Sequence, residues 1–172
     1  MNSSVALALE NFSIKIREWL EIENKKIINI DNLEELILKI NSTFSFIKIE
    51  EGYDMLLELL NNGENYIINY DKQSTLEDKF EFIIKAFCYS LLFDKKTLNY
   101  YELQNGYHVP ICKIYCDENT NYLAKAITIP RDRFLSELVK FSTNDGVVNI
   151  ESMQKTLNNK NMYSRGRDLK IW

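Results

Sequence analysis

Residues 75–93 read TLEDKFEFIIKAFCYSLLF, and this stretch decides the fold because it is the most apolar helical pattern in the chain. Such an apolar helical segment is typical of a helix in the core of a protein. Thr75 and Asp78 suit its first turn, because side-chain oxygens can accept the free backbone N–H groups there. We therefore expect a central helix against which the other elements pack.

Two segments that precede this helix have the pattern of β-strands. Residues 44–50 (FSFIKIE) alternate apolar and polar side chains, and residues 66–70 (YIINY) are rich in aromatic and β-branched side chains. We expect these two strands to pair antiparallel in an exposed sheet. Residues 53–60 fit either a strand or a helix, and the Asn-Asn-Gly run at 61–63 predicts a turn.

Most of the other segments have helical periodicity. Ser3 or Ser4 is the expected cap of the first helix, and Asn105-Gly106 predicts a β-hairpin within residues 99–115. The helices are predicted at residues 5–21, 33–40, 117–128, 131–141 and 150–158.

The pattern as a whole predicts an α+β fold, a mostly helical single domain over residues 1–172 with a small sheet of about three strands. Within it we expect N-terminal helices at 5–41, the sheet and central helix at 44–93, and a hairpin with C-terminal helices at 99–172.

Composition excludes several classes of function. The chain has 172 residues, 45% hydrophobic and 27% charged, with a net charge of −4, which disfavours direct binding of nucleic acid. It contains one histidine, so zinc sites with several imidazole ligands are disfavoured. Three cysteines do not make a disulfide framework, and no signal peptide or membrane span is apparent. We therefore expect a cytoplasmic protein.

Three stretches resemble the ImmA/IrrE-type metallopeptidases, which cut helix-turn-helix repressors. GENYIIN at 63–69 is similar to the family's strand before the active helix, and EFIIKAFCYSLL at 81–92 is similar to the active helix. NYLAKAITIP at 121–130 is similar to the family's AN-x-FA-xx-LLMP segment. The resemblance implies a zincin-like minimal peptidase scaffold, with a substrate groove between residues 81–93 and the strand at 66–70.

The zinc-binding motif of that family is missing. In HExxH, two histidines four residues apart bind zinc and the glutamate between them polarises water. The corresponding positions are Ala86, Phe87 and Ser90, and the third ligand position falls near Asn119. Since alanine and phenylalanine cannot bind zinc or act as bases, the resemblance implies a catalytically inactive member without zinc or another cofactor.

His108, Cys112 and Cys116 form a second candidate constellation, because they are spaced four residues apart. On a helix they would share one face, and Cys88 or Asp117 would complete a four-ligand metal site. The same residues also permit a Cys–His enzyme that uses His108 with Cys112 or Cys116. The simpler interpretation is ordinary packing with one surface histidine, and we expect no metal.

Tyrosine and arginine side chains are the candidate contacts to a partner, since tyrosines combine a large apolar ring with a polar tip. Arginine pairs bind acidic groups, although most form only surface ion pairs. The candidate partner-binding residues are Tyr66, Tyr70, Tyr100, Tyr101, Tyr107, Arg131 and Arg133.

Together these features favour a metallopeptidase-like protein without catalysis that binds another protein, as a phage or mobile-element regulator or counter-defence factor. The resemblance implies a helix-turn-helix repressor or a host defence protein as partner. The alternatives are the Cys–His enzyme and a self-associating structural module, and the oligomeric state stays open.

Overall fold

The computed structural model describes residues 1–60 and 63–172 and confirms the predicted α+β class. Two compact units are present: Met1–Asn32 together with Tyr122–Trp172, and Leu33–Asn121. We call them unit 1 and unit 2. The expectation of a single domain over residues 1–172 stays a prediction.

Unit 2 contains the sheet. Its elements are α2 (Leu33–Thr43), β1 (Ile47–Gly52), β2 (Leu56–Leu60), β3 (Asn65–Asp71), α3 (Leu76–Leu92), the 3₁₀ helix η3 (Lys95–Thr97), α4 (Tyr100–Asn105), β4 (Tyr107–Val109) and α5 (Ile111–Cys116). The sheet has four strands in the order β1-β3-β2-β4, where about three were expected. The ambiguous segment at 53–60 supplies β2, because its leucines alternate between buried and half-buried positions.

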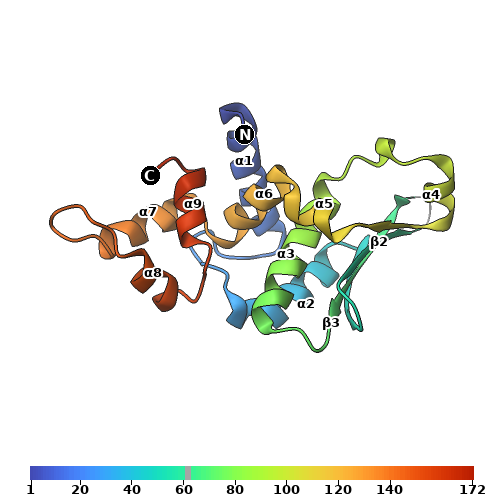
Figure 1. Cartoon of the computed structure of the whole chain (residues 1–172), viewed down its shortest axis with the longest axis horizontal. Coiled ribbons are helices and arrows are strands. Elements are labelled where there is room, and N and C mark those ends of the chain that lie inside the picture. Colours follow the sequence, from blue (N-terminus) through green and yellow to red (C-terminus); the bar gives the residue numbers. More distant parts are fainter. Residues whose placement is uncertain (61–62) are drawn as a thin grey trace. The chain divides into compact units, whose positions relative to one another are not determined.

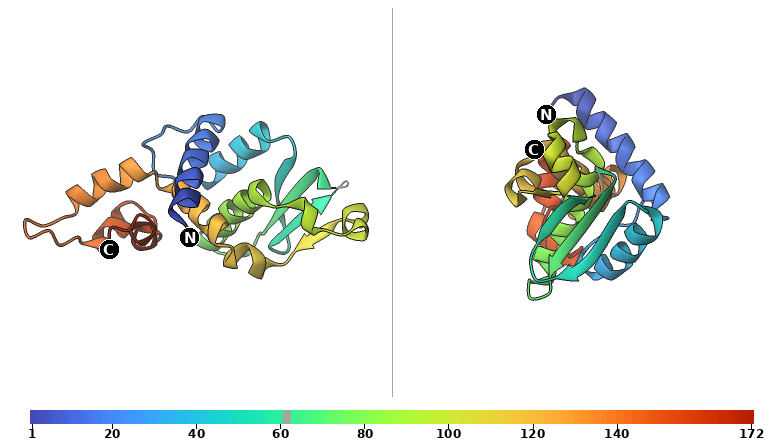
Figure 2. Two further views of the ribbon diagram at one scale, coloured as in Figure 1. Left: turned by 90° about the horizontal axis from the view of Figure 1, so that it is seen from above. Right: turned by 90° about the vertical axis from the view of Figure 1, so that its right-hand side faces the viewer.

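The predicted antiparallel pairing of residues 44–50 with 66–70 is wrong, because β1 and β3 are parallel. The chain reverses after β1 and again between β2 and β3, which pair antiparallel, so β3 runs in the direction of β1. β3 therefore lies inside the sheet, and the edge strands are β1 and β4 (Figure 2, right). In the predicted turn at 61–63, Asn61 and Asn62 lie outside the described residues.

One face of the sheet is buried. Its inward side chains alternate along the strands, and they include Ile49, Leu57 and Ile68, which are register neighbours. α2 packs on β1, and α3 packs on β3 and β1 (Figure 1). α3 is the predicted central helix, and the Thr75 side chain accepts the backbone N–H of Asp78 at its start.

The predicted hairpin around Asn105-Gly106 is wrong. Residues 100–105 form α4, because the Asn99 side chain accepts the backbone N–H of Glu102, and the Glu102 carboxylate accepts the N–H of Asn99. Gly106 follows the last helical residue with φ +87°, a conformation that glycine adopts without a steric penalty. The chain then continues into the short strand β4 instead of returning along a second strand.

Unit 1 is helical. It contains α1 (Ser3–Trp19), η1 (Ile30–Asn32), α7 (Arg131–Lys140), α8 (Ile150–Thr156) and α9 (Met162–Asp168), together with most of α6 (Glu118–Thr128). α9 was not predicted, and the cap of α1 is Asn2 rather than Ser3 or Ser4. Its core comprises Ile129, Phe134, Leu138, Met153 and Met162.

None of the helices in the described ranges combines the length and the apolar character that a membrane crossing needs.

Candidate functional site

The three α3 positions that the sequence resemblance assigns to the peptidase motif lie in the core of unit 2. Ala86 and Phe87 have no exposed surface, and Ser90 is 5% exposed. The Phe87 ring packs edge-on against Phe44 at 5.2 Å between centroids, and the Ser90 hydroxyl donates to the Phe87 carbonyl at 2.7 Å. Asn119, in the first turn of α6, is exposed. Ala86, Phe87 and Ser90 therefore serve packing within unit 2.

A surface pocket of about 320 Å³ lies at the C-terminal end of α3. Its walls come from α3, the segment around η3, α5 and the start of α6, all within unit 2. The lining residues are Tyr89, Leu92, Phe93, Asp94, Thr97, Lys113, Asp117 and Thr120. This pocket was not predicted, because its walls come from segments that no local sequence pattern brings together.

Stacked aromatic rings form one wall of the pocket. The Tyr89 and Phe93 rings stack at 5.4 Å between centroids, and Phe93 stacks on Tyr107 of β4 at 6.2 Å. The Lys113 ammonium donates to the Tyr107 hydroxyl at 3.0 Å and lies 5.7 Å from the centre of that ring. This hydrogen bond raises the pKa of Lys113, so the side chain is positively charged at neutral pH.

Polar groups also line the pocket. Asp117 accepts the backbone N–H of Thr120 at 2.6 Å, while the buried Thr120 hydroxyl has no hydrogen-bond partner in the described part of the chain. Apolar walls with a few fixed polar groups are typical of sites that bind small molecules or single side chains of a partner. The pocket can therefore hold an apolar or aromatic group and contact polar atoms beside it.

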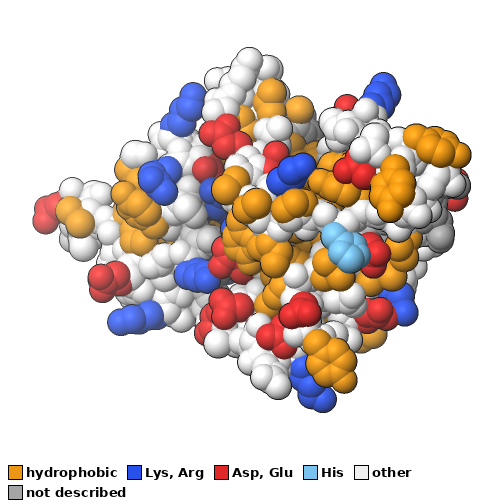
Figure 3. Space-filling view, turned by 45° about the vertical axis from the view of Figure 1, so that its right-hand side comes forward, with side chains coloured by type: hydrophobic (Ala, Val, Ile, Leu, Met, Phe, Trp, Pro, Cys, Tyr) orange, Lys and Arg blue, Asp and Glu red, His pale blue; other side chains and the backbone are white. Residues whose placement is uncertain are grey.

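The second candidate constellation is not assembled as a metal site. His108 (pale blue in Figure 3) lies on β4. Its Nε2 is 2.9 Å from the carboxylate of Glu58, the residue opposite it on β2. Cys112 and Cys116 are exposed on α5, whereas Cys88 is buried in α3, where loss of hydration raises the pKa of its thiol. Among the residues that the structure describes, no group of three or more His, Cys, Asp and Glu side chains could hold a metal ion.

The predicted tyrosine contacts divide by exposure. Tyr100 and Tyr101 on α4 are 79% and 73% exposed, and Tyr70 and Tyr107 are half-buried. Tyr66 is only 2% exposed, so its assignment as a surface contact is corrected. It occupies an inward position of β3, and this burial raises the pKa of its hydroxyl to about 12.

The predicted arginine contacts lie at the start of α7 in unit 1. Arg131 is exposed, whereas the Arg133 guanidinium pairs with the buried Glu137 carboxylate at 2.6 Å. Because Glu137 also pairs with Lys140 at 2.7 Å, Arg133 belongs to a local charge network. Of the two, Arg131 is the more available to a partner.

The structure also changes the interpretation of the groove predicted between residues 81–93 and the strand at 66–70. β3 is flanked by β1 and β2, so its backbone cannot receive an added strand, and β4 is the edge strand whose Tyr107 ring continues the aromatic wall of the pocket. Comparison of the chain with models of protein families, with curated proteins and with solved structures finds no match. The family resemblance therefore stays a prediction that rests on the sequence motifs alone.

Proposed function

We propose that this chain is a non-catalytic relative of the ImmA/IrrE-type metallopeptidases that acts by binding another protein. One observation carries the proposal: Ala86, Phe87 and Ser90, the positions of the missing motif, are packed into the core of unit 2. A metallopeptidase needs an open coordination position for water at this place. A scaffold that fills it with hydrophobic side chains retains only its surface for function.

We propose the edge of β4 and the adjoining pocket as the binding surface, because they offer two complementary contacts. An extended peptide can add to an edge strand through backbone hydrogen bonds, while pockets beside the strand select its side chains. Here the Tyr107 and Phe93 rings link strand and pocket, and Lys113 adds a positive charge. The proposed ligand is an extended segment of a protein that carries an aromatic or aliphatic side chain.

The proposed biological role follows from the resemblance. The partner is a helix-turn-helix repressor or a host defence protein, and the protein acts in the cytoplasm as a phage or mobile-element factor. The three cysteines are free thiols, which suits a reducing compartment. The exposed pair Tyr100 and Tyr101 would extend the contact beyond the pocket.

Loss of catalysis is tested with protein purified without chelators. We expect less than stoichiometric zinc by elemental analysis and no cleavage of a helix-turn-helix repressor with or without added zinc. One tightly held zinc ion per chain, or cleavage that a chelator abolishes, would overturn the proposal.

Protein binding is tested by quantitative mass spectrometry of proteins that co-purify from the source cells. Replacing Tyr107 by Ala should reduce the amount of a specific partner at least tenfold, as expected for a central interface tyrosine. Tyr53→Ala is the matched control, because Tyr53 is 97% exposed and lies between β1 and β2. Equal recovery by all three proteins would exclude the surface at β4.

The self-association alternative has its own readout. The mass of the purified chain in solution, measured over a range of micromolar concentrations, distinguishes a monomer from a dimer. A dimer that Tyr100→Ala or Tyr101→Ala dissociates would favour the structural module over binding of another protein.

A further inference from the structure

Unit 1 contains a second hollow, separate from the pocket of unit 2. Its volume is about 320 Å³, and it is bounded by α1, by the loop that contains Lys25 and by the start of α7. Leu7 and Ile14, both largely exposed on α1, line it together with the buried Arg17. The residues that line the hollow therefore include both apolar and cationic side chains.

Arg17 is unusual because its charge is buried without an acidic hydrogen-bond partner. It is 1% exposed, and its guanidinium donates to the backbone carbonyls of Ile127, Glu23 and Lys26. Its Nε has no hydrogen-bond partner in the described ranges. Burial lowers the pKa of Arg17 to about 10, although the nearby Glu23 opposes this effect. A buried cation with only neutral acceptors is stabilised by an anion placed next to it.

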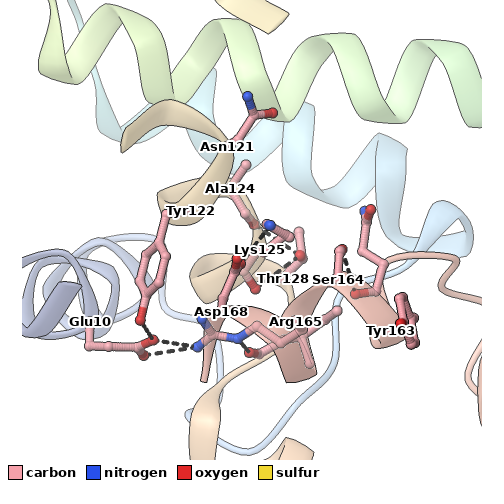
Figure 4. Close-up of polar contacts among 12 residues, drawn as sticks. Glu10, Asn121, Tyr122, Ala124, Lys125, Thr128, Tyr163, Ser164, Arg165 and Asp168 are labelled. Atoms are coloured by element: carbon pink, nitrogen blue, oxygen red, sulfur yellow. Dashed lines mark hydrogen bonds and ion pairs between the residues drawn. The ribbon is translucent and has the colours of Figure 1, made fainter. Parts of the chain in front are cut away.

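Glu10 also lines the hollow, but its carboxylate already forms an ion pair and accepts a hydrogen bond (Figure 4). Its carboxylate pairs with the fully buried Arg165 guanidinium at 2.7 Å and accepts the Tyr122 hydroxyl at 2.7 Å. Arg165 is held in place by a second hydrogen bond, from its Nε to the Ile129 carbonyl at 3.0 Å. Glu10 therefore does not neutralise the cations that surround the hollow.

The start of α7 adds further positive potential. This helix of ten residues begins next to the hollow, and its cap residue Pro130 provides no side chain to accept its free N–H groups. Lys25 and Arg131 are exposed at the rim, and Asp132 is the lining carboxylate that remains besides Glu10. Free N–H groups at a helix N-terminus favour bound anions, especially beside cationic side chains.

We propose that this hollow binds a small organic oxyanion, a phosphate monoester or a carboxylate carried on an apolar body. The oxyanion would lie between Arg17, Arg131 and the start of α7, and the apolar body would rest against Leu7 and Ile14. An organic anion should bind more tightly than a bare inorganic ion, because the inorganic ion would leave Leu7 and Ile14 exposed to water. This inference is independent of the function proposed for unit 2.

The test is a calorimetric titration of the full chain with phenyl phosphate, benzoate, inorganic phosphate and phenol. Phenyl phosphate or benzoate should saturate one site and bind at least tenfold more tightly than inorganic phosphate or phenol. Whichever of the two binds more tightly identifies the oxyanion. Added salt should weaken the binding, because part of the attraction comes from exposed charges.

Two rim substitutions keep the test independent of folding. Arg131→Ala and Lys25→Ala should each weaken binding of the organic anion about tenfold, the loss expected for one charge-assisted hydrogen bond. Lys15→Ala, an exposed lysine of α1 outside the lining, should bind as the unmodified chain does. Unchanged affinity in the Arg131→Ala Lys25→Ala double variant, or no saturable binding of either organic anion, would overturn the proposal.

Discussion

The two units fill their interiors in different ways. In unit 2, nine residues of α3 are buried, and apart from Ser90 they are hydrophobic or aromatic side chains and a cysteine. Unit 1 buries two whole arginines, Arg17 and Arg165, beside its apolar core. Arg165 forms an ion pair with Glu10, which is 155 residues away in the chain, and Arg17 is bonded to backbone carbonyls.

The two units therefore differ in what stabilises their interiors: apolar burial in unit 2, and apolar burial together with hydrogen-bonded buried charges in unit 1. An apolar helix gains stability from the area that it removes from water, almost regardless of which apolar neighbour covers it. A buried arginine is tolerated only if particular acceptors lie at particular places. We therefore expect unit 2 to be sensitive to added charge and unit 1 to be sensitive to removed charge.

The largest effect is expected for Phe87→Glu, which places a carboxylate in the apolar interior of unit 2. Phe87 is fully buried and packs on the Phe44 ring, so the new charge would lose its hydration. The expected loss is about 5 kcal/mol or more, comparable with the whole stability of an ordinary domain. Circular dichroism and urea unfolding measure it.

Leu76→Glu is the matched control for that variant. Leu76 lies on the same helix and is 57% exposed, so a carboxylate there stays hydrated and also faces the positive end of the helix dipole. Its stability should change by less than about 1 kcal/mol. A Phe87→Glu protein as stable as this control would show that the face of α3 at Phe87 is open to solvent.

Arg165→Met tests the opposite dependence in unit 1. It keeps much of the apolar stem but removes the cation that pairs with the Glu10 carboxylate, which keeps its hydrogen bond from the Tyr122 hydroxyl, and the expected loss is about 3–5 kcal/mol. Arg167→Met is the control, because Arg167 is exposed on the same helix and its guanidinium stacks on the Tyr163 ring. Chemical denaturation of the two variants side by side gives the comparison, and equal losses would contradict a special role for the buried pair.

The same distinction explains which features could be predicted from the sequence. The predicted helix at 75–93 is confirmed as α3 because its signals, the apolar pattern and the Thr75 cap, lie within one segment. The Glu10–Arg165 pair has no local signal, since the two residues are joined only by the tertiary fold. The pocket at the end of α3 escaped prediction for the same reason, because it collects side chains from four segments.

Two errors had local signals that were open to a different interpretation. The alternation in residues 65–71 places Tyr66 and Ile68 on one face, and that face is the buried one. Asn-Gly occurs both in hairpin turns and at the ends of helices. Here Asn99 and Glu102 form a capping box, which favours a helix in residues 100–105. The family resemblance stays untested, because no match with a known protein bears on it.

A loss of stability of about 2–3 kcal/mol is expected from Tyr66 at alkaline pH. Burial raises the pKa of its hydroxyl from 10.0 to about 12, and that hydroxyl has no hydrogen-bond partner in the described chain. Because the folded protein holds this proton more tightly, the stabilisation is complete below pH 10 and is lost as the pH rises to about 12. Tyr66→Phe should flatten this loss, whereas Tyr53→Phe, at an exposed position, should not. Urea unfolding at several alkaline pH values measures the slope.

The smallest effect, about 1 kcal/mol, is expected for Asn99→Ala. Asn99 stabilises the first turn of α4 by accepting the backbone N–H of Glu102. Removing the cap should increase hydrogen exchange in residues 100–105 while exchange in α3 stays unchanged. Asn105→Ala is the control, because Asn105 is the last residue of α4 and its side chain donates to the Tyr101 carbonyl without contacting the N-cap. If Asn99→Ala instead slowed exchange at residues 107–109, β4 would have grown longer at the expense of α4. The hairpin would then be a structure that competes with α4, and the apolar core of unit 2 would be compatible with both.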